Sequence, residues 1–164
     1  MQLIKPKFWD KNKGLLAVLL LPITFLYILF ISARKKLVKP QEFKIPILCI
    51  GNIYMGGTGK TPVSIFLAKK LSNLGVKAAI IRKYYKNHRD EHILTKEKYN
   101  YFFLDKKRSS AIKKIEGSNF DLGILDDGFQ DYTIKKDFNI ICFNERQFIG
   151  NGLVFPSGPL RENL

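Results

Sequence analysis

The sequence has few of the residues that bind soft metals or form disulfides. Its 164 residues include two cysteines and two histidines. No cysteine–histidine spacing typical of a zinc site is present, and two cysteines do not predict a disulfide framework. Cys49 and Cys142 both lie in apolar runs that predict buried strands, where a thiol packs as a small hydrophobic side chain. This usage is typical of a protein in a reducing cytoplasm.

The two histidines, His88 and His92, have the i, i+4 spacing of a metal-binding pair on a helix. No helical pattern surrounds them, and the neighbouring sequence offers no third ligand. We therefore expect exposed loop histidines here.

Acidic residues are also scarce, because 14 Asp and Glu stand against 28 Lys and Arg, which gives a net charge of +14. Half of this excess, +7, lies in residues 1–40. Such a balance favours an anionic partner, and lipid headgroups, a phosphorylated substrate or nucleic acid would each fit. The alternative is a basic surface that serves solubility alone. Since no recognised nucleic-acid-binding motif is present and half of the charge flanks an apolar segment, we predict no nucleic-acid partner.

A glycine-rich segment, residues 51–62 (GNIYMGGTGKTP), follows an apolar run and precedes an amphipathic helical pattern. This order of strand, glycine loop and helix is the context of a phosphate-binding loop. In such a loop the backbone amides surround phosphate oxygens, Lys60 reaches the terminal phosphates and the Thr61 hydroxyl binds Mg²⁺. The usual pattern has glycine at position 54, where this chain has Tyr54. We predict an ATP and Mg²⁺ site whose nucleotide-binding residues are Tyr54, Met55, Gly56, Gly57, Thr58, Gly59, Lys60 and Thr61.

Apolar runs and helical patterns alternate after a linker at residues 39–42. We expect strands at 45–50, 76–81, 99–104, 121–125 and 138–143, and helices at 60–74 and 106–115. The first of these helices is expected to bury one face, made of Val63, Phe66, Leu67, Leu71 and Leu74. Residues 82–98 are polar and are expected to be irregular. The alternation predicts an α/β fold, a P-loop NTPase-like and mostly parallel sheet with helices on both faces, over residues 40–164.

A second signal, after the glycine-rich loop, lies in residues 122–130 (LGILDDGFQ), where an apolar strand ends in the acidic residues Asp126 and Asp127. A carboxylate at the C-terminal end of a strand, beside a phosphate loop, is how such proteins hold magnesium. Two adjacent residues of an extended strand point to opposite faces, so one Asp is expected to hold the metal and the other to orient water, Lys60 or the substrate. The alternative is a D-D-G turn that only closes a strand.

Together these segments resemble the tetraacyldisaccharide 4'-kinases, which phosphorylate a lipid A precursor. The shared motifs occur in the family's order and cover nearly the whole chain. They are Phe8-Trp9 before an apolar segment, the loop at 51–62, the D-D-G-F-Q segment at 126–130, Gly150-Asn151-Gly152 and the stretch FPSGPLRE at 155–162. The resemblance implies ATP-dependent transfer of the γ-phosphate to the 4'-hydroxyl of a membrane-bound tetraacyldisaccharide 1-phosphate.

The resemblance also implies roles for single residues. Asp90 aligns with the family's catalytic aspartate, and Lys60 is expected to stabilise charge on the transferring phosphate. The implied metal ligands are Thr61, Asp126, Asp127 and Glu162. From the residues alone, Asp90 is one acid in a polar loop, and Glu162 is equally well explained by a surface ion pair with Arg161.

The chain departs from the family pattern in three places. Lys83 and Tyr85 replace glycines of the family's S-R-G-Y-G segment, and Asp131 stands where a histidine often follows D-D-G-F-Q. Family members are roughly twice as long, a size expected for two lobes. The second lobe, with the histidine that pairs with the catalytic aspartate, is therefore expected to be absent from these 164 residues.

Residues 1–39 are predicted to form a basic N-terminus with a membrane-associated helix. Residues 14–33 are 20 consecutive uncharged residues, which is long enough to span a bilayer. The two flanks carry four basic residues each, so the positive-inside rule gives no orientation. Because ATP is cytoplasmic, a helix embedded in the cytoplasmic leaflet of the inner membrane keeps both flanks on anionic headgroups, and we favour it over a spanning helix. A signal peptide is disfavoured because Arg34 to Lys36 follow the apolar segment.

One alternative function from another class is left open. A membrane-anchored P-loop ATPase or switch protein, acting on a protein partner, would account for the loop, the paired aspartates and the anchor. It would not account for Phe8-Trp9 or for the segment at 155–162.

Overall fold

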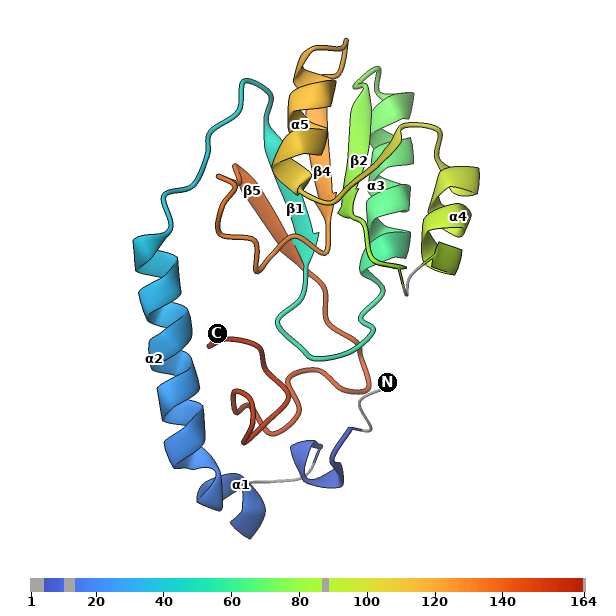
Figure 1. The fold of residues 1–164 in the computed structure, drawn as a ribbon. Helices are drawn as coiled ribbons and strands as arrows, with labels where there is room; N and C mark the ends of the chain where they lie inside the picture. The colour runs from blue at the N-terminus through green and yellow to red at the C-terminus, as the bar shows by residue number, and fades with distance from the viewer. Residues whose placement is uncertain (1–4, 11–13, 87–88, 164) are drawn as a thin grey trace. The chain divides into compact units, whose positions relative to one another are not determined.

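The computed structural model describes residues 5–10, 14–86 and 89–163, and for residues 89–91 it describes the backbone alone. The chain forms two compact units, drawn together in Figure 1. Unit 1 comprises Met1–Val38, Asn52–Thr58 and Phe143–Leu164, and unit 2 comprises Lys39–Gly51 and Gly59–Cys142. Each unit is described by itself.

Unit 2 is built on a five-stranded parallel sheet in the order β3-β2-β4-β1-β5. Figure 1 labels four of these strands, β2, β4, β1 and β5. The strands are β1 (Ile47–Gly51), β2 (Ala78–Lys83), β3 (Phe102–Asp105), β4 (Leu122–Asp126) and β5 (Phe138–Ile141). All five predicted strands are present, each within a few residues of its expected bounds. The predicted parallel α/β sheet is confirmed.

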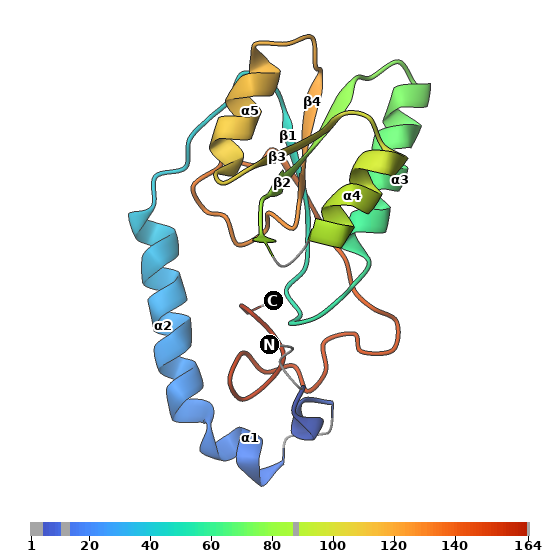
Figure 2. The same cartoon turned by 45° about the vertical axis from the view of Figure 1, so that its right-hand side comes forward.

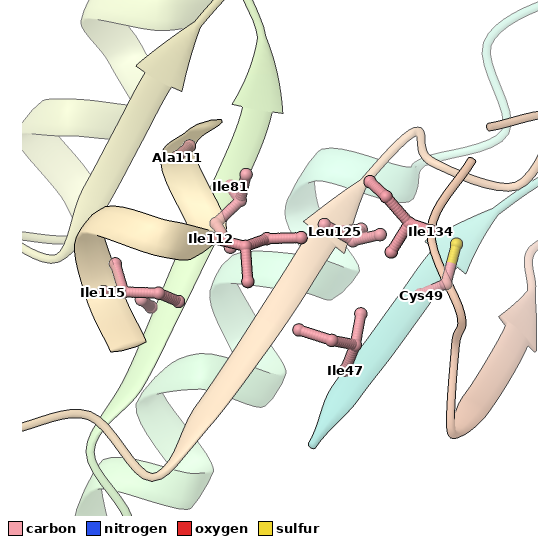
Figure 3. Packing of buried hydrophobic residues seen from close by; sticks show 9 residues of the cluster. Ile47, Cys49, Ile81, Ala111, Ile112, Ile115, Leu125 and Ile134 are labelled. Atoms are coloured by element: carbon pink, nitrogen blue, oxygen red, sulfur yellow. The ribbon is translucent and has the colours of Figure 1, made fainter. Parts of the chain in front are cut away.

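The helices of unit 2 cover both faces of this sheet. They are α3 (Lys60–Asn73), α4 (Arg89–Lys98) and α5 (Arg108–Glu116). Alternate residues of β1 join different clusters: Ile47 and Cys49 pack with α5, and Leu48 and Ile50 pack with α3. Figure 2 shows α5 on one side of the strands and α3 with α4 on the other, and Figure 3 shows Ile112 of α5 among the side chains of the first cluster.

Helix α4 corrects the expectation that residues 82–98 are irregular. Its buried positions include His92 and Thr95, which are polar, so the segment has no apolar stripe to reveal it. The His92 side chain is 4% exposed, and its ring centroid lies 5.6 Å from that of Tyr84. The expectation of an exposed loop histidine was therefore wrong for His92, while His88 lies outside the described residues.

The buried face of α3 agrees with the prediction in part, because Val63, Leu67 and Leu71 pack against the core. Ser64, Ile65 and Ala68 are buried, whereas Phe66 and Leu74 are 61% and 78% exposed. Small residues at 64 and 68 let the helix lie close to the sheet, so the larger Phe66 points outward. The apolar run of β5 was expected to be buried, yet all four of its residues are exposed, because β5 pairs with β1 alone at the edge of the sheet.

Unit 1 contains a 3₁₀ turn, η1 (Lys7–Trp9), and the helices α1 (Leu15–Leu19) and α2 (Leu21–Leu37). The apolar segment expected to be one helix is thus broken at Leu20, since Pro22 lacks an amide hydrogen and is favoured in the first turn of a new helix. Over the described residues, no helix combines the length and the apolar character needed to cross a bilayer.

Candidate functional site

Asp126, the last residue of β4, forms the centre of a polar cluster in unit 2. Its carboxylate is fully buried, with 0% exposure. The Thr61 hydroxyl donates to Asp126 Oδ2 at 2.9 Å, and the Ser64 hydroxyl donates to Oδ1 at 3.3 Å. Thr61 and Ser64 lie in the first turns of α3, which begins at the same sheet edge where β1 and β4 end. The structure therefore brings together two predicted site residues, Thr61 and Asp126.

Arg82 supplies the positive charge that faces this carboxylate. Its Nη1 lies 3.5 Å from Asp126 Oδ2 and 3.4 Å from the Thr61 hydroxyl, and the residue is 7% exposed. Burial raises the pKa of the Asp126 carboxyl, and the Arg82 charge and the Thr61 hydrogen bond oppose that rise. Sequence reasoning did not assign Arg82 this partner. The contact follows from the register of the sheet: Ile81 of β2 pairs with Leu125 of β4, so the residues that come next, Arg82 and Asp126, lie side by side.

Asp127 faces a different partner from its neighbour. Its backbone has a φ of +56°, in the left-handed region, which turns the chain sharply after β4. Its amide donates to the Ile50 carbonyl at 2.9 Å, and its carboxylate Oδ1 lies 3.5 Å from Lys60 Nζ. The structure thus directs Asp126 toward Thr61 and Asp127 toward Lys60.

The turn that holds Asp127 is tied to α5 by Arg108. The Arg108 Nη2 donates to the Asp127 carbonyl at 2.6 Å, and Nη1 donates to Asp131 Oδ2 at 3.2 Å. Sequence reasoning did not single out this contact, because it joins residues 19 positions apart through a main-chain oxygen.

The oxygen atoms of this cluster fit a magnesium ion. Hydroxyl and carboxylate oxygens are the ligands that Mg²⁺ prefers, and Thr61, Asp126 and Asp127 present them at one sheet edge. Within the described residues, no group of three or more His, Cys, Asp or Glu side chains is placed to hold a metal. Two carboxylates and a hydroxyl leave positions that the phosphate oxygens of a nucleotide are suited to fill.

The loop between β1 and α3 contains the predicted nucleotide-binding residues. In unit 1, the buried Asn52 side chain donates to the carbonyls of Tyr54 and Gly56 at 2.8 and 3.0 Å, and the Met55 amide donates to the Pro159 carbonyl at 2.8 Å. Tyr54 is 1% exposed, with its hydroxyl 3.4 Å from Asp10 Oδ1, so it packs into unit 1 where the usual pattern has glycine.

The end of this loop lies in unit 2. Gly59 has a φ of +77°, a conformation that favours glycine, directly before Lys60 and Thr61 at the start of α3.

Glu162 and the C-terminal segment pack within unit 1. Glu162 is 5% exposed and forms an ion pair with Lys35 in the last turn of α2. The Trp9 indole donates to the Pro156 carbonyl at 3.1 Å, and the Thr24 hydroxyl donates to the Ser157 hydroxyl at 2.8 Å. These contacts bring the N-terminal motif Phe8-Trp9 and the C-terminal stretch at 155–162 together in space. The alternative of a surface ion pair for Glu162 does not fit its burial, and Lys35 is a partner that the sequence did not indicate.

Two further predicted positions lie at the end of β2 and the start of α4. The backbone of Asp90 lies in the first turn of α4, and its side chain is outside the described part of the chain. Lys83 is the last residue of β2, and its Nζ lies 5.5 Å from the centroid of the Tyr85 ring.

Comparison with known proteins gives one family. Residues 16–164 match the family model described as Tetraacyldisaccharide-1-P 4'-kinase. The chain is 44% identical over 165 residues to the tetraacyldisaccharide 4'-kinase of Pelagibacter ubique (strain HTCC1062), which covers 100% of the chain and 52% of that relative. It is 34% identical over 180 residues to the tetraacyldisaccharide 4'-kinase of Bartonella tribocorum, again covering 100% of the chain and 52% of the relative.

A solved structure gives the same result. The chain resembles the crystal structure of the "apo" form of LpxK from Aquifex aeolicus in complex with ATP, with a TM-score of 0.73 and 25% identity, over 90% of this chain and 55% of that one. The chain thus spans about half the length of the curated relatives it matches. From the family match over residues 16–164 and the shared fold, the chain belongs to the tetraacyldisaccharide 4'-kinase family.

Proposed function

We propose that the chain carries the ATP-binding half of a kinase that transfers the γ-phosphate of ATP to the 4'-hydroxyl of a tetraacyldisaccharide 1-phosphate. The observation that carries this proposal is the contact of the Thr61 hydroxyl with the buried Asp126 carboxylate at 2.9 Å. That contact joins the phosphate-loop helix to the acidic strand end, the two parts that hold a metal–nucleotide complex in P-loop proteins. The family match supports the acceptor.

In the proposed reaction, residues of unit 2 position and neutralise the phosphates. Thr61 and Asp126 would hold Mg²⁺, with Asp127 beside them, and the ion would neutralise charge on the β- and γ-phosphates. Lys60, whose Nζ lies 3.5 Å from Asp127 Oδ1, is held in a defined direction by that carboxylate. Its ammonium group then stabilises the negative charge of the transferring phosphate.

Two acids outside this cluster complete the proposal. Asp90 would accept or orient the proton of the sugar hydroxyl, which is the role of a general base in phosphoryl transfer to an alcohol. The family pattern gives Glu162 as a further metal ligand. Both assignments rest on the family pattern.

We also propose that α1 and α2 embed in the cytoplasmic leaflet of the inner membrane. Large apolar side chains are exposed along both helices, among them Leu15, Leu19, Phe25, Leu26 and Phe30, each at 60% or more. The basic residues Arg34 and Lys36 occupy the last turn of α2, where they would meet anionic headgroups. An embedded helix would hold the chain at the leaflet that contains the acylated substrate.

A transfer assay separates this function from the alternative of an ATPase or switch protein. The chain is joined to the second half of the Pelagibacter ubique relative, and ³²P transfer from γ-labelled ATP to tetraacyldisaccharide 1-phosphate is measured in detergent micelles. We expect labelled lipid, with ATP consumption dependent on the lipid, and no labelled lipid from the Lys60→Ala variant. ATP turnover that does not depend on the lipid would contradict the kinase assignment, as would a wild-type amount of labelled lipid from Lys60→Ala.

A further inference from the structure

We propose that Arg108 is a positioning residue for the nucleotide site, which acts by fixing the main chain of Asp127 so that the Asp127 carboxylate meets Lys60. The proposal rests on the proposed function of this sheet edge as an ATP site. It assigns a role to the first residue of α5, a helix that otherwise contributes apolar side chains to the core.

One guanidinium group joins two parts of the turn that follows β4. Arg108 Nη2 donates to the Asp127 carbonyl at 2.6 Å, and Nη1 donates to the Asp131 carboxylate at 3.2 Å. The Arg108 side chain is 6% exposed, and its Nε is buried without an acceptor among the described residues. The two Nη contacts therefore hold the whole side chain, and a planar fork of this kind has no equivalent in lysine.

The main chain at Asp127 needs an external restraint. A left-handed conformation costs most side chains about 1–2 kcal/mol and Asp less, and Asp127 has a φ of +56°. The strain is held from both sides, because the Asp127 amide donates to the Ile50 carbonyl at 2.9 Å while Arg108 binds the Asp127 carbonyl. The next residue must be a glycine, since a Cβ at Gly128 would lie 2.8 Å from Leu125 Cβ.

Asp131 fixes Arg108 from the far end of the same turn. Its Oδ1 accepts a hydrogen bond from the Thr133 hydroxyl at 2.6 Å, and its amide donates to the Gly128 carbonyl at 3.0 Å. The acid that binds Arg108 is thus itself immobile. The result is a closed chain of contacts from α5 through Arg108 to Asp127, which leaves the Asp127 carboxylate 3.5 Å from Lys60 Nζ.

A purely structural arginine would stabilise unit 2 without acting through Asp127. A double-mutant cycle on the 164-residue chain separates the two roles, with MgATP affinity measured by calorimetry. Arg108→Lys is compared in the wild-type and the Asp127→Asn backgrounds. We expect a loss of roughly tenfold in the wild-type background, the size of one lost charge-assisted hydrogen bond, and less than about twofold in Asp127→Asn.

Lys113→Met is the matched control, because Lys113 is an exposed cation on the same helix. Its affinity for MgATP should stay within about twofold of wild type. An equal loss from Arg108→Lys in both backgrounds, or no loss in either, would overturn the proposal.

A second measurement does not depend on nucleotide binding. Amide hydrogen exchange at Asp127 and Gly128 should accelerate in Arg108→Lys and, more weakly, in Asp131→Asn, while Leu125 in β4 stays protected. Unchanged exchange at Asp127 would refute the restraint itself. If the wild-type chain fails to bind MgATP while the variants show this exchange pattern, the proposed function is refuted and the restraint by Arg108 still holds.

Discussion

The Asp126→Asn substitution tests the charge balance at the centre of the candidate site. The change keeps the size of the side chain and removes its negative charge. Arg82 then remains at 7% exposure, 3.5 Å from a neutral amide in place of a carboxylate. Breaking a buried ion pair by removing one partner costs about 3 kcal/mol or more, because the remaining charge stays desolvated.

The expected shift in melting temperature follows from that cost and from the size of the chain. For a protein of 164 residues, 1 kcal/mol corresponds to a shift of about 2–4 °C, so Asp126→Asn should lower Tm by roughly 6–12 °C. Adding Arg82→Met removes the guanidinium that faced the carboxylate, and the double variant should recover more than about 1 kcal/mol relative to the sum of the single effects.

Thermal unfolding followed by circular dichroism at neutral pH measures these shifts. Asp121→Asn is the control, because Asp121 accepts a hydrogen bond from the Lys77 amide at 2.7 Å but is solvent-exposed. The control should change stability by no more than about 0.5 kcal/mol. If Asp126→Asn melts like the control, or if the two substitutions add without coupling, the reasoning about a buried Arg82–Asp126 pair is refuted.

Further predictions follow from other parts of the chain. Burial raises the pKa of the Cys49 thiol to about 11, so a thiol-reactive dye at pH 8 should label Cys49 only after unfolding. Burial raises the pKa of Asp131, but the Thr133 hydrogen bond and the Arg108 charge outweigh this effect, so the pKa is lowered. Ionised Asp131 therefore stabilises the fold above its unfolded pKa, and this contribution is lost as the pH falls through the folded value. In acid unfolding, the stability of Asp131→Asn should consequently decrease less with falling pH than that of the wild type. Gly59→Ala forces a side chain into a φ of +77° and should cost about 1 kcal/mol, read as a lower melting temperature. Phe25→Asp should weaken binding to anionic vesicles in a sedimentation assay, while Phe66→Asp should not, since the two phenylalanines are 62% and 61% exposed in different units; equal binding by both variants would contradict the membrane proposal.

The parts of unit 2 that the sequence predicts best are those determined by local pattern. The strand before the glycine loop, the helix that begins at Lys60 and the strand that ends at Asp126 are each marked by a contiguous apolar run or a breaker residue. Because parallel strands place their C-terminal ends at one edge, these local features also predict that Thr61 and Asp126 meet, as they do. The family resemblance, read from the same motifs, is confirmed by the match over residues 16–164.

The missed features depend on contacts between distant segments. Arg82 pairs with Asp126 because β2 lies beside β4, and alternation of strands and helices does not give strand order. Helix α4 buries His92 and Thr95 where a helical pattern would need apolar residues. Tyr54 looked like a defect of the glycine pattern, and its place is explained by packing that involves Asp10, more than forty positions away. The roles of Asp90 and Glu162 stay predictions.

Titration of the 164-residue chain with MgATP in a calorimeter tests the central claim most directly. The account predicts saturable binding of one nucleotide, with an affinity reduced at least tenfold in Lys60→Ala and in Asp126→Asn, since each variant removes a charged contact to the phosphates or the metal, worth about 1.5–3 kcal/mol. Phe66→Lys, on the exposed side of the same helix α3, should bind as the wild type does. No binding by the wild-type chain, or equal binding by Lys60→Ala, would contradict the account.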